Sequence, residues 1–310
     1  MDLSLNSHHD YLIGVDGGGS GTRVRVERPD GAEVAHGAAG PSALANGIEN
    51  AWAAVQEAIT SAFAAAGITS PPLARMAIGL GLAGAHNRQR AASFVQHDPG
   101  FGALALATDG YTTLLGAHDG QPGAIIAIGT GSIGEVRDAA GVHREVGGWG
   151  FPASDEGSGA WMGLRAINHA QRILDGRAAM DAFGQAVIDF CGGDRDRLFD
   201  WLAQASQVRY AQIAPLVLAH EGQPAAAAIL RDAGGEIAAI ATALDPSGAL
   251  PLALCGGLGA PLRPYLPEAL AARISEARAD AAAGALHLLR AHLATANDAT
   301  SHALAKRDLT

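Results

Sequence analysis

The residues of this chain that could do chemistry gather at short glycine-rich turns. The first turn is Asp16-Gly-Gly-Gly-Ser-Gly-Thr22, which follows the apolar run Leu12–Val15 and precedes an alternating run. Two strands joined by such a turn are typical of a β-hairpin, and glycines at its tip let backbone N–H groups approach an anion without interference from Cβ atoms. We therefore interpret the turn as a phosphate-binding turn, with a plain hairpin turn as the alternative. Asp16 could face Mg²⁺ directly or through water, or simply stabilise the turn.

The same pattern occurs a second time in the chain. The apolar run Gly123–Ile128 leads into Gly129-Thr-Gly-Ser132, and a further strand pattern follows. Thr130 and Ser132 offer hydroxyl and amide donors to phosphate oxygens, with a structural Ser/Thr turn as the alternative. Self-similar segments in the two halves of a chain are typical of related structural units, so the two hairpins predict two related domains.

Three further places carry candidate residues. Asp109 follows the apolar run Ala103–Ala107, and ligands of open α/β sheets gather beyond the carboxyl ends of strands. It is therefore a candidate base, with the N-cap of a following helix as the alternative. Trp149 and Asp155 could hold the face and hydroxyls of a sugar, although tryptophans are more often core residues. The turn Gly256-Gly-Leu-Gly259 could let a purine lie close to the backbone, or only connect a strand to a helix.

Composition excludes several kinds of site. The formal net charge of −10, without clusters of basic residues, disfavours binding to nucleic acids and to anionic membranes. Lys306 is the only lysine, which removes the lysines of P-loops and protein kinases, so ATP would be held by backbone amides, hydroxyls and Mg²⁺. Cys191 and Cys255 are too few for a disulfide framework or an iron–sulfur site. We find neither a signal peptide nor a membrane span, and we expect a cytoplasmic protein.

Strands and helices must bring these residues together. Residues 48–66 carry apolar side chains three and four positions apart, the period of an amphipathic helix. The apolar runs at 73–82 and 103–107 alternate with helical segments, which predicts an α/β fold with a mixed sheet. Ser154 is the predicted N-cap of a helix ending at Leu174.

We expect two domains, an N-terminal one of residues 1–117 and a C-terminal one of residues 118–296. Further helices are expected at about 208–220 and 277–294, and the last of these could pack back on the N-terminal domain. Residues 297–310 are polar and are predicted to form a flexible tail.

Taken in order, the motifs resemble one known family. The resemblance rests on Asp16-Gly-Gly-Gly-Ser-Gly-Thr, Thr108-Asp109, Ile128-Gly-Thr-Gly-Ser132, Gly147-Gly-Trp-Gly150, Ser154-Asp-Glu-Gly157 and Cys255-Gly-Gly-Leu-Gly259. The chain resembles the BadF/BadG/BcrA/BcrD ATPase family, in its N-acetylglucosamine and glucosamine kinase branch, over about residues 11–295. The resemblance implies two actin-like ATPase (ribonuclease H-like) domains, each with a mixed sheet flanked by helices, and an active site in the cleft between them.

The resemblance also implies a role for each motif. It assigns the phosphates of ATP to Gly17, Gly18, Gly19, Ser20, Gly21, Thr22, Gly129, Thr130 and Gly131, adenosine to Gly256, Gly257, Leu258 and Gly259, and Mg²⁺ to Asp16. It assigns the sugar to Ser42, Asn46, Asp109, Ser132, Gly148, Trp149 and Asp155, with Asp109 as the base. The loop around Ser42 and Asn46 departs from the usual spacing of the family, and either residue could make the sugar contact expected there.

The activity that the resemblance implies is phosphorylation of an amino sugar by ATP, with N-acetylglucosamine at its 6-hydroxyl as the first expectation. Glucosamine and N-acetylmuramate are the alternative acceptors. A non-kinase ATPase or activator and a sugar-sensing protein are the alternative functions. The activators of the family use a cysteine-bound iron–sulfur cluster, and two distant cysteines do not fit one. Relatives of this size also suggest a homodimer.

Overall fold

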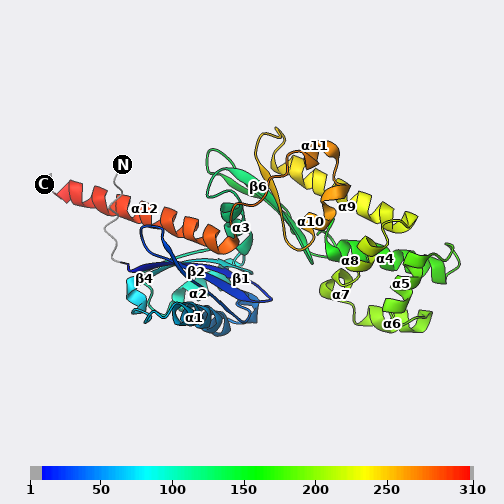
Figure 1. Cartoon of the computed structure of the whole chain (residues 1–310), viewed down its shortest axis with the longest axis horizontal. Coiled ribbons are helices and arrows are strands. Elements are labelled where there is room, and N and C mark those ends of the chain that lie inside the picture. The colour runs from blue at the N-terminus through cyan, green and yellow to red at the C-terminus, as the bar shows by residue number, and fades with distance from the viewer. Residues whose placement is uncertain (1–8, 308–310) are drawn as a thin grey trace. The chain divides into compact units, whose positions relative to one another are not determined.

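The computed structural model describes the backbone of residues 9–307 and the side chains of residues 9–296. Its contacts divide the chain into two compact units. Unit 1 contains the residues up to Gln121 together with those from Ala277 onward, and unit 2 is Pro122–Glu276. Unit 1 is therefore made of two separate stretches of the chain, and unit 2 is the stretch that lies between them in the sequence (Figure 1).

A five-stranded mixed sheet forms the centre of unit 1, in the order β3-β2-β1-β4-β5. The strands are β1 (Tyr11–Gly17), β2 (Thr22–Glu27), β3 (Glu33–Ala39), β4 (Met76–Leu82) and β5 (Ala103–Ala107). β1 and β2 form the predicted hairpin and β2 pairs with β3, both antiparallel, whereas β1, β4 and β5 run parallel. The carboxyl ends of the three parallel strands therefore share one edge, where ligands of such sheets bind. The mixed sheet predicted from the sequence is confirmed.

Helices cover both faces of this sheet (Figure 1). On one face Ile13 and Val15 pack with Trp52 and Phe63 of α1, and on the other Leu12 packs with side chains of the last helix. Side chains of a strand alternate between its faces, which explains this division. The helices of unit 1 are α1 (Ile48–Ala65), α2 (Arg88–Gln96), α3 (Asp109–Ala117) and α12 (Ala281–Arg307), with the short turns η1 (Leu44–Asn46) and η2 (Leu73–Arg75).

Two glycines let α12 lie directly against the sheet. A Cβ atom on Gly14 of β1 would lie 2.1 Å from the carbonyl oxygen of Ala282, and one on Gly79 of β4 would lie 2.1 Å from that of Ala285. No side chain fits in that space. The C-terminal stretch is therefore an integral part of unit 1.

Unit 2 is built on a four-stranded sheet in the order β8-β7-β6-β9. Its strands are β6 (Gly123–Ile128), β7 (Ser132–Arg137), β8 (His143–Gly147) and β9 (Leu252–Cys255). β6 and β7 form the second predicted hairpin, and β6 runs parallel to β9. The long helices α4 (Gly159–Leu174) and α9 (Pro224–Leu244) contribute to the core that covers this sheet.

Shorter helices complete unit 2. They are α5 (Ala182–Phe190), α6 (Arg195–Ala203), α7 (Gln207–Ala211), α8 (Ala214–Ala219), α10 (Gly259–Leu262), η3 (Arg263–Tyr265) and α11 (Glu268–Ala271). Among the described residues no single helix has the length and apolar character to cross a membrane, whereas the bent pair Gln207–Ala219 and Pro224–Leu244 passes that test.

The structure corrects three details of the predicted elements. The N-cap of α4 is Ser158, whose hydroxyl accepts from the N–H of Trp161, and the hydroxyl of Ser154 instead donates to the Glu156 carboxylate. The helix expected at 208–220 is divided into α7 and α8. The last helix continues through Arg307, past the predicted end at 294 and into the segment predicted as a flexible tail, while residues 308–310 of that segment lie outside the described residues.

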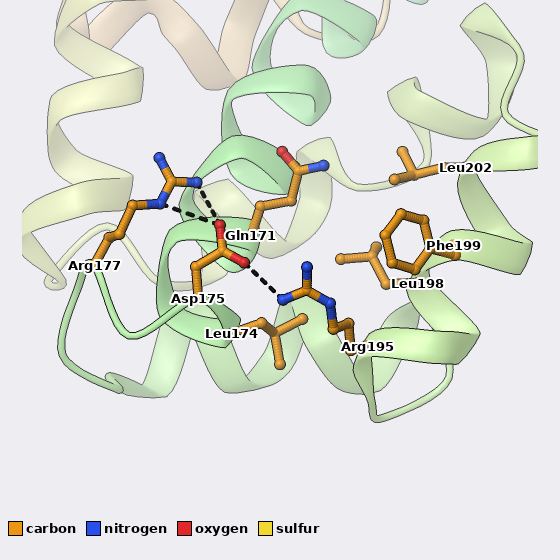
Figure 2. A pocket seen from close by; sticks show the side chains of 8 residues that line it. All are labelled: Gln171, Leu174, Asp175, Arg177, Arg195, Leu198, Phe199 and Leu202. Carbon is orange, nitrogen blue, oxygen red and sulfur yellow. Dashed lines mark hydrogen bonds and ion pairs between the residues drawn. The ribbon is translucent and has the colours of Figure 1, made fainter.

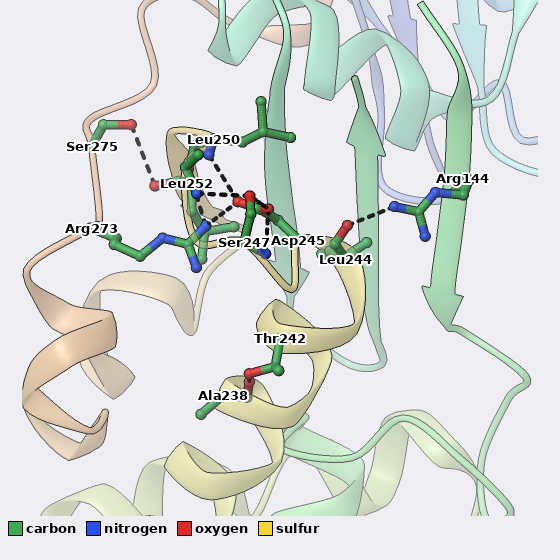
Figure 3. Close-up of polar contacts among 11 residues, drawn as sticks. Arg144, Ala238, Thr242, Leu244, Asp245, Ser247, Leu250, Leu252, Arg273 and Ser275 are labelled. Carbon is green, nitrogen blue, oxygen red and sulfur yellow. Dashed lines mark hydrogen bonds and ion pairs between the residues drawn. The ribbon is translucent and has the colours of Figure 1, made fainter. Parts of the chain in front are cut away.

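A buried carboxylate holds the chain where it enters β9. Asp245 follows α9 and accepts hydrogen bonds from the Ser247 N–H and hydroxyl, from the Leu250 N–H at 2.8 Å and from Arg273 Nη2 at 2.8 Å (Figure 3). Burial acts to raise the pKa of Asp245, but these hydrogen bonds and the Arg273 charge outweigh it, and the pKa lies below its usual value. The network fixes the start of the strand that leads into the turn at Gly256–Gly259.

Candidate active site

The first glycine turn presents its tip to solvent. The turn is closed by a 3.0 Å hydrogen bond from the Gly18 N–H to the Gly21 carbonyl, and Gly19 and Ser20 are exposed. A Cβ atom on Gly18 or Gly19 would meet no other atom within 4 Å, and neither residue has a left-handed φ. Neither packing nor backbone conformation therefore requires glycine here. The open space at the tip leaves room for an anionic ligand to approach the backbone closely.

Two hydroxyls that the sequence assigns to ligands lie behind the turn instead. Thr22 and Ser42 are buried, and their hydroxyl oxygens are 2.7 Å apart. Thr22 also donates to the Gly40 carbonyl at 2.7 Å, and a Cβ atom on Gly17 would lie 2.1 Å from the Ser42 hydroxyl. The structure thus places both side chains in the interior, where their hydrogen bonds support the turn.

Asp16 and Asp109 lie at the same edge of the unit 1 sheet. Asp16 is the last residue but one of β1, and Asp109 is the first residue of α3, directly beyond β5. Burial raises the pKa of Asp16, the Arg23 charge lowers it, and the negative charge of Asp109 raises it further. Burial also raises the pKa of Asp109, against the hydrogen bonds from the Gly110 and Asp109 amides and the charge of His86.

The alternative role of Asp109 as a helix N-cap is wrong. The N-cap of α3 is Thr108, whose hydroxyl accepts from the Tyr111 N–H at 3.1 Å. The Asp109 carboxylate is therefore not needed to cap the start of the helix, and the residue remains partly exposed at the edge of the sheet.

Backbone hydrogen bonds bring two more loops to this edge. Ala83 donates to the Gly17 carbonyl at 2.8 Å and accepts from the Leu44 N–H at 2.9 Å. These bonds place η1, which ends at the exposed Asn46, beside the first glycine turn. The turn after β4 also carries His86, whose charge acts on Asp109. His86 is not among the site residues predicted from the sequence, because its only signal there is a glycine-bearing turn at 83–87.

In unit 2 the second and third glycine turns lie side by side. The Gly159 N–H, at the start of α4, donates to the Gly129 carbonyl at 2.8 Å, and the Leu258 N–H donates to the Ile128 carbonyl at 3.0 Å. Gly256 has a φ of 81°, and a Cβ atom there would lie 2.4 Å from the Ile128 oxygen. Thr130, at the tip of the hairpin, is exposed. The structure thus brings Gly129–Gly131 and Gly256–Gly259 together around the start of α4.

Asp155 is buried behind the second turn. Its Oδ2 accepts from Gln207 Nε2 at 2.6 Å, and its Oδ1 accepts from the Ser132 N–H at 3.4 Å. Burial raises the pKa of Asp155, against the hydrogen bonds from the Ser132 and Phe151 amides. The Ser132 hydroxyl donates to the Glu156 carbonyl at 2.7 Å, so it serves the loop. Sequence reasoning missed Gln207, which lies 52 positions away.

Trp149 is 88% exposed. It lies between Gly148 and Gly150, which have φ values of 70° and 96°, conformations that favour glycine. A Cβ atom on Gly148 would lie 2.8 Å from a side-chain atom of Ile133. The alternative reading of Trp149 as a core residue is wrong, and its exposed ring could stack on the apolar face of a sugar.

A separate pocket in unit 2 contains none of the predicted site residues. Asp175 accepts from Arg177 Nη2 and from Arg195 Nη1, both at 2.7 Å (Figure 2). The hydrogen bonds from the two arginines lower the pKa of Asp175. The pocket lies beside this ion pair and is also lined by Leu198 and Phe199 of α6. The pair links the end of α4 to α6, which is a structural role.

Comparison with known proteins identifies the family. The model of the BadF/BadG/BcrA/BcrD ATPase family matches residues 13–259. The chain belongs to this family. A glucosamine kinase of Vibrio cholerae is 33% identical over 279 residues, 89% of this chain and 95% of that protein. An N-acetylmuramic acid/N-acetylglucosamine kinase of Clostridium acetobutylicum is 31% identical over 185 residues, 58% of this chain and 60% of that protein.

A solved structure supports the same assignment. A protein of Chromobacterium violaceum, named as a candidate N-acetylglucosamine kinase, matches with a TM-score of 0.86 and 52% sequence identity, over 91% of this chain and 99% of its own. A glucokinase of Streptomyces griseus shares the fold, with a TM-score of 0.50 and 16% identity over 90% of this chain and 98% of its own. The family resemblance seen in the sequence is confirmed, and so is the predicted α/β fold with two mixed sheets flanked by helices.

Proposed function

We propose that this protein transfers the γ-phosphoryl group of ATP to an amino sugar, most specifically to the 6-hydroxyl of N-acetylglucosamine. Its relatives support the class of ATP-dependent sugar kinases. The observation that carries the proposal is the pair Asp16 and Asp109, two partly buried carboxylates at one sheet edge beside a glycine turn with open space at its tip. A sugar kinase needs these three parts: an anion-binding turn, a carboxylate for Mg²⁺ and a carboxylate for the acceptor hydroxyl.

Phosphoryl transfer depends mainly on alignment and on neutralisation of charge. We assign the γ-side phosphates to Gly17–Gly21 with Ser20, the β-side phosphates to Gly129–Gly131 with Thr130, and adenosine to Gly256–Gly259. Backbone amides replace the lysine that P-loop enzymes use.

Asp16 fits the Mg²⁺ role. Mg²⁺ prefers oxygen ligands and is usually held by one or two carboxylates while it keeps several waters. Asp16 offers one such carboxylate beside the first turn, with the negative charge of Asp109 close enough to raise its pKa. When bound, Mg²⁺ would neutralise the charge that develops on the phosphates.

Asp109 would receive the proton of the acceptor hydroxyl. A carboxylate of ordinary pKa is a weak base for an alcohol, and burial raises the pKa of Asp109 toward the working pH. The shift is favourable because a general base works best when its pKa lies near that pH. His86, whose charge acts in the opposite direction, lies in the turn after β4.

The sugar contacts are the finer part of the proposal. Asp155 supplies a buried carboxylate that can accept from a sugar hydroxyl, and Trp149 supplies an exposed ring. We also assign Gly148 and Asn46 to the sugar. Glucosamine and N-acetylmuramate are the alternative acceptors, and they differ from N-acetylglucosamine at the nitrogen or at O3.

The test is ADP release with a panel of acceptors, namely N-acetylglucosamine, glucosamine, N-acetylmuramate and glucose. We expect Asp109→Ala and Asp109→Asn to lower sugar-dependent turnover at least about a hundredfold while the KM for ATP stays within a few-fold. Glu57→Gln, which changes an exposed carboxylate of α1, is the control and should match the wild type.

Two results would contradict the proposal. ADP release that no sugar increases would indicate a non-kinase ATPase. Unchanged sugar-dependent turnover in Asp109→Ala would remove Asp109 from the mechanism.

A further inference from the structure

Asp155 has an unusual backbone conformation. Its φ is 66°, and its side chain is buried, with the residue 5% exposed. Few residues other than glycine adopt the left-handed region, and aspartate is among those that tolerate it best. Such conformations persist where the surrounding structure holds them, and they are common at binding sites. The neighbours of Asp155 must therefore supply the contacts that hold it.

Backbone N–H groups of Ser132 and Phe151 donate to the carboxylate, and its short side-chain contact comes from the amide of Gln207. Its Nε2 donates to Asp155 Oδ2 at 2.6 Å, much shorter than the 3.4 Å contact from the Ser132 N–H to Oδ1. Gly131 leaves the space for this contact, because a Cβ atom there would lie 2.8 Å from Asp155 Oδ2 and 3.1 Å from Gln207 Nε2. One residue of the second glycine turn thus makes room for both partners.

The donor to Asp155 is neutral. Among the ion pairs found between described residues, none includes Asp155. An arginine or lysine would neutralise the carboxylate, and an arginine could occupy both of its oxygens, whereas the Gln207 amide contacts one oxygen and leaves the negative charge in place. A carboxylate accepts about four hydrogen bonds, so Asp155 keeps capacity for a sugar hydroxyl.

Gln207 lies on a helix that packs closely against the rest of unit 2, so it can restrict the motion of the Asp155 side chain. It is the first residue of α7, whose N-cap is Ser206. The helix packs closely on α4, since a Cβ atom on Gly163 would lie 2.0 Å from the Tyr210 carbonyl oxygen. The Tyr210 ring also contacts the rings of Trp201 and Phe151, with centroids 5.3 Å and 5.1 Å apart. Gln207 therefore reaches Asp155 from a firmly packed element.

We propose that Gln207 is a positioning residue for the acceptor sugar: its amide fixes the Asp155 carboxylate in the orientation that accepts a hydrogen bond from a sugar hydroxyl. The inference rests on the proposed function and adds to it a residue outside every motif that pointed to the family. The inference predicts that loss of the Gln207 amide weakens binding of the sugar and leaves binding of ATP unchanged.

The experiment compares Gln207→Ala and Gln207→Glu with the wild type in steady-state assays over a range of pH. For Gln207→Ala we expect the KM for the sugar to rise about tenfold, the loss of one hydrogen bond to a charged group. The KM for ATP and kcat should stay within about twofold. Val208→Ala, at an exposed position next to Gln207 on the same helix, is the matched control and should leave all three parameters unchanged.

Gln207→Glu separates positioning from general stability. At neutral pH its carboxylate would replace the amide donor beside Asp155, where the charge of Glu156 also acts, and the repulsion between the negative charges would turn Asp155 out of its orientation. The sugar KM should therefore be high at neutral pH. It should fall toward the wild-type value as pH decreases, because the new carboxyl group, once protonated, can donate the same hydrogen bond.

The outcomes distinguish the inference from the proposed function. A wild-type protein that releases no ADP with any amino sugar overturns both. A sugar KM that is unchanged in Gln207→Ala, or a KM for ATP that rises equally, overturns the inference alone. A sugar KM in Gln207→Glu that does not decrease at low pH also overturns it.

Discussion

The same substitution, glycine to alanine, should affect stability at Gly79 and ATP binding at Gly18, because the two glycines have different surroundings. In Gly79→Ala the new Cβ would lie 2.1 Å from the Ala285 oxygen and 2.9 Å from a Leu289 atom, so α12 must withdraw from the sheet. Overpacking of this kind costs about 1–3 kcal/mol, of which up to about 1 kcal/mol is recovered because alanine restricts the unfolded chain. We expect a net loss of about 1–2 kcal/mol, or a decrease in melting temperature of roughly 2–8 °C for a unit of this size.

In Gly18→Ala the new Cβ would meet no atom within 4 Å. Stability should therefore stay within about 0.5 kcal/mol of the wild type. If phosphate binds over this turn, the same methyl group occupies space that the phosphate needs. We expect the KM for ATP to rise at least about tenfold, equivalent to about 1.4 kcal/mol of binding free energy.

The assays are thermal unfolding followed by circular dichroism and ADP release as a function of ATP concentration, on both variants in parallel. A KM for ATP that is unchanged in Gly18→Ala would remove the first glycine turn from phosphate binding. A melting temperature that is unchanged in Gly79→Ala would refute the close packing of α12 on β4.

Three further predictions concern Asp245 and Trp149. Asp245→Ala should destabilise the protein by about 3–5 kcal/mol in urea unfolding, because it leaves Arg273 without its buried partner. Because the pKa of Asp245 is lowered in the folded protein, its ionised carboxylate stabilises the fold above the unfolded-state pKa of about 3.9, and this stabilisation is lost as pH falls through the lower folded value. Asp245→Asn should abolish this part of the acid sensitivity. A free energy of unfolding that depends on pH as in the wild type would contradict the prediction. Trp149→Ala removes an exposed ring, so it should leave the melting temperature within about 2 °C while the sugar KM rises several-fold; unchanged KM would exclude stacking.

The hairpins, the mixed sheet and the family could be predicted because their signals are local. Alternating apolar residues, glycine turns and the order of the motifs can all be read within a few positions. The identity of Thr108 as the cap of α3 was missed for a local reason, because Thr108 and Asp109 are both good N-caps and the choice depends on where the helix starts.

The remaining features depend on contacts between distant positions. Whether the Thr22 hydroxyl faces a ligand or the protein depends on Ser42, which lies 20 positions away. The support of Asp155 by Gln207 spans 52 positions, and the ion pair between Arg290 of α12 and Glu27 of β2 spans 263. No periodicity of the sequence reports such pairs, so a prediction from pattern alone could not find them.

The split construction of unit 1 has a consequence for biosynthesis. All residues of unit 2 leave the ribosome before the first residue of α12, and domains generally fold as units during synthesis. Until then the face of the N-terminal sheet that carries Leu12, Ala77 and Ala105 lacks Leu286 and Leu289, with which it packs. The apolar face of the nascent N-terminal sheet therefore stays uncovered until the last part of the chain has been synthesised. A premature stop before residue 281 would leave this face permanently uncovered and prone to aggregation.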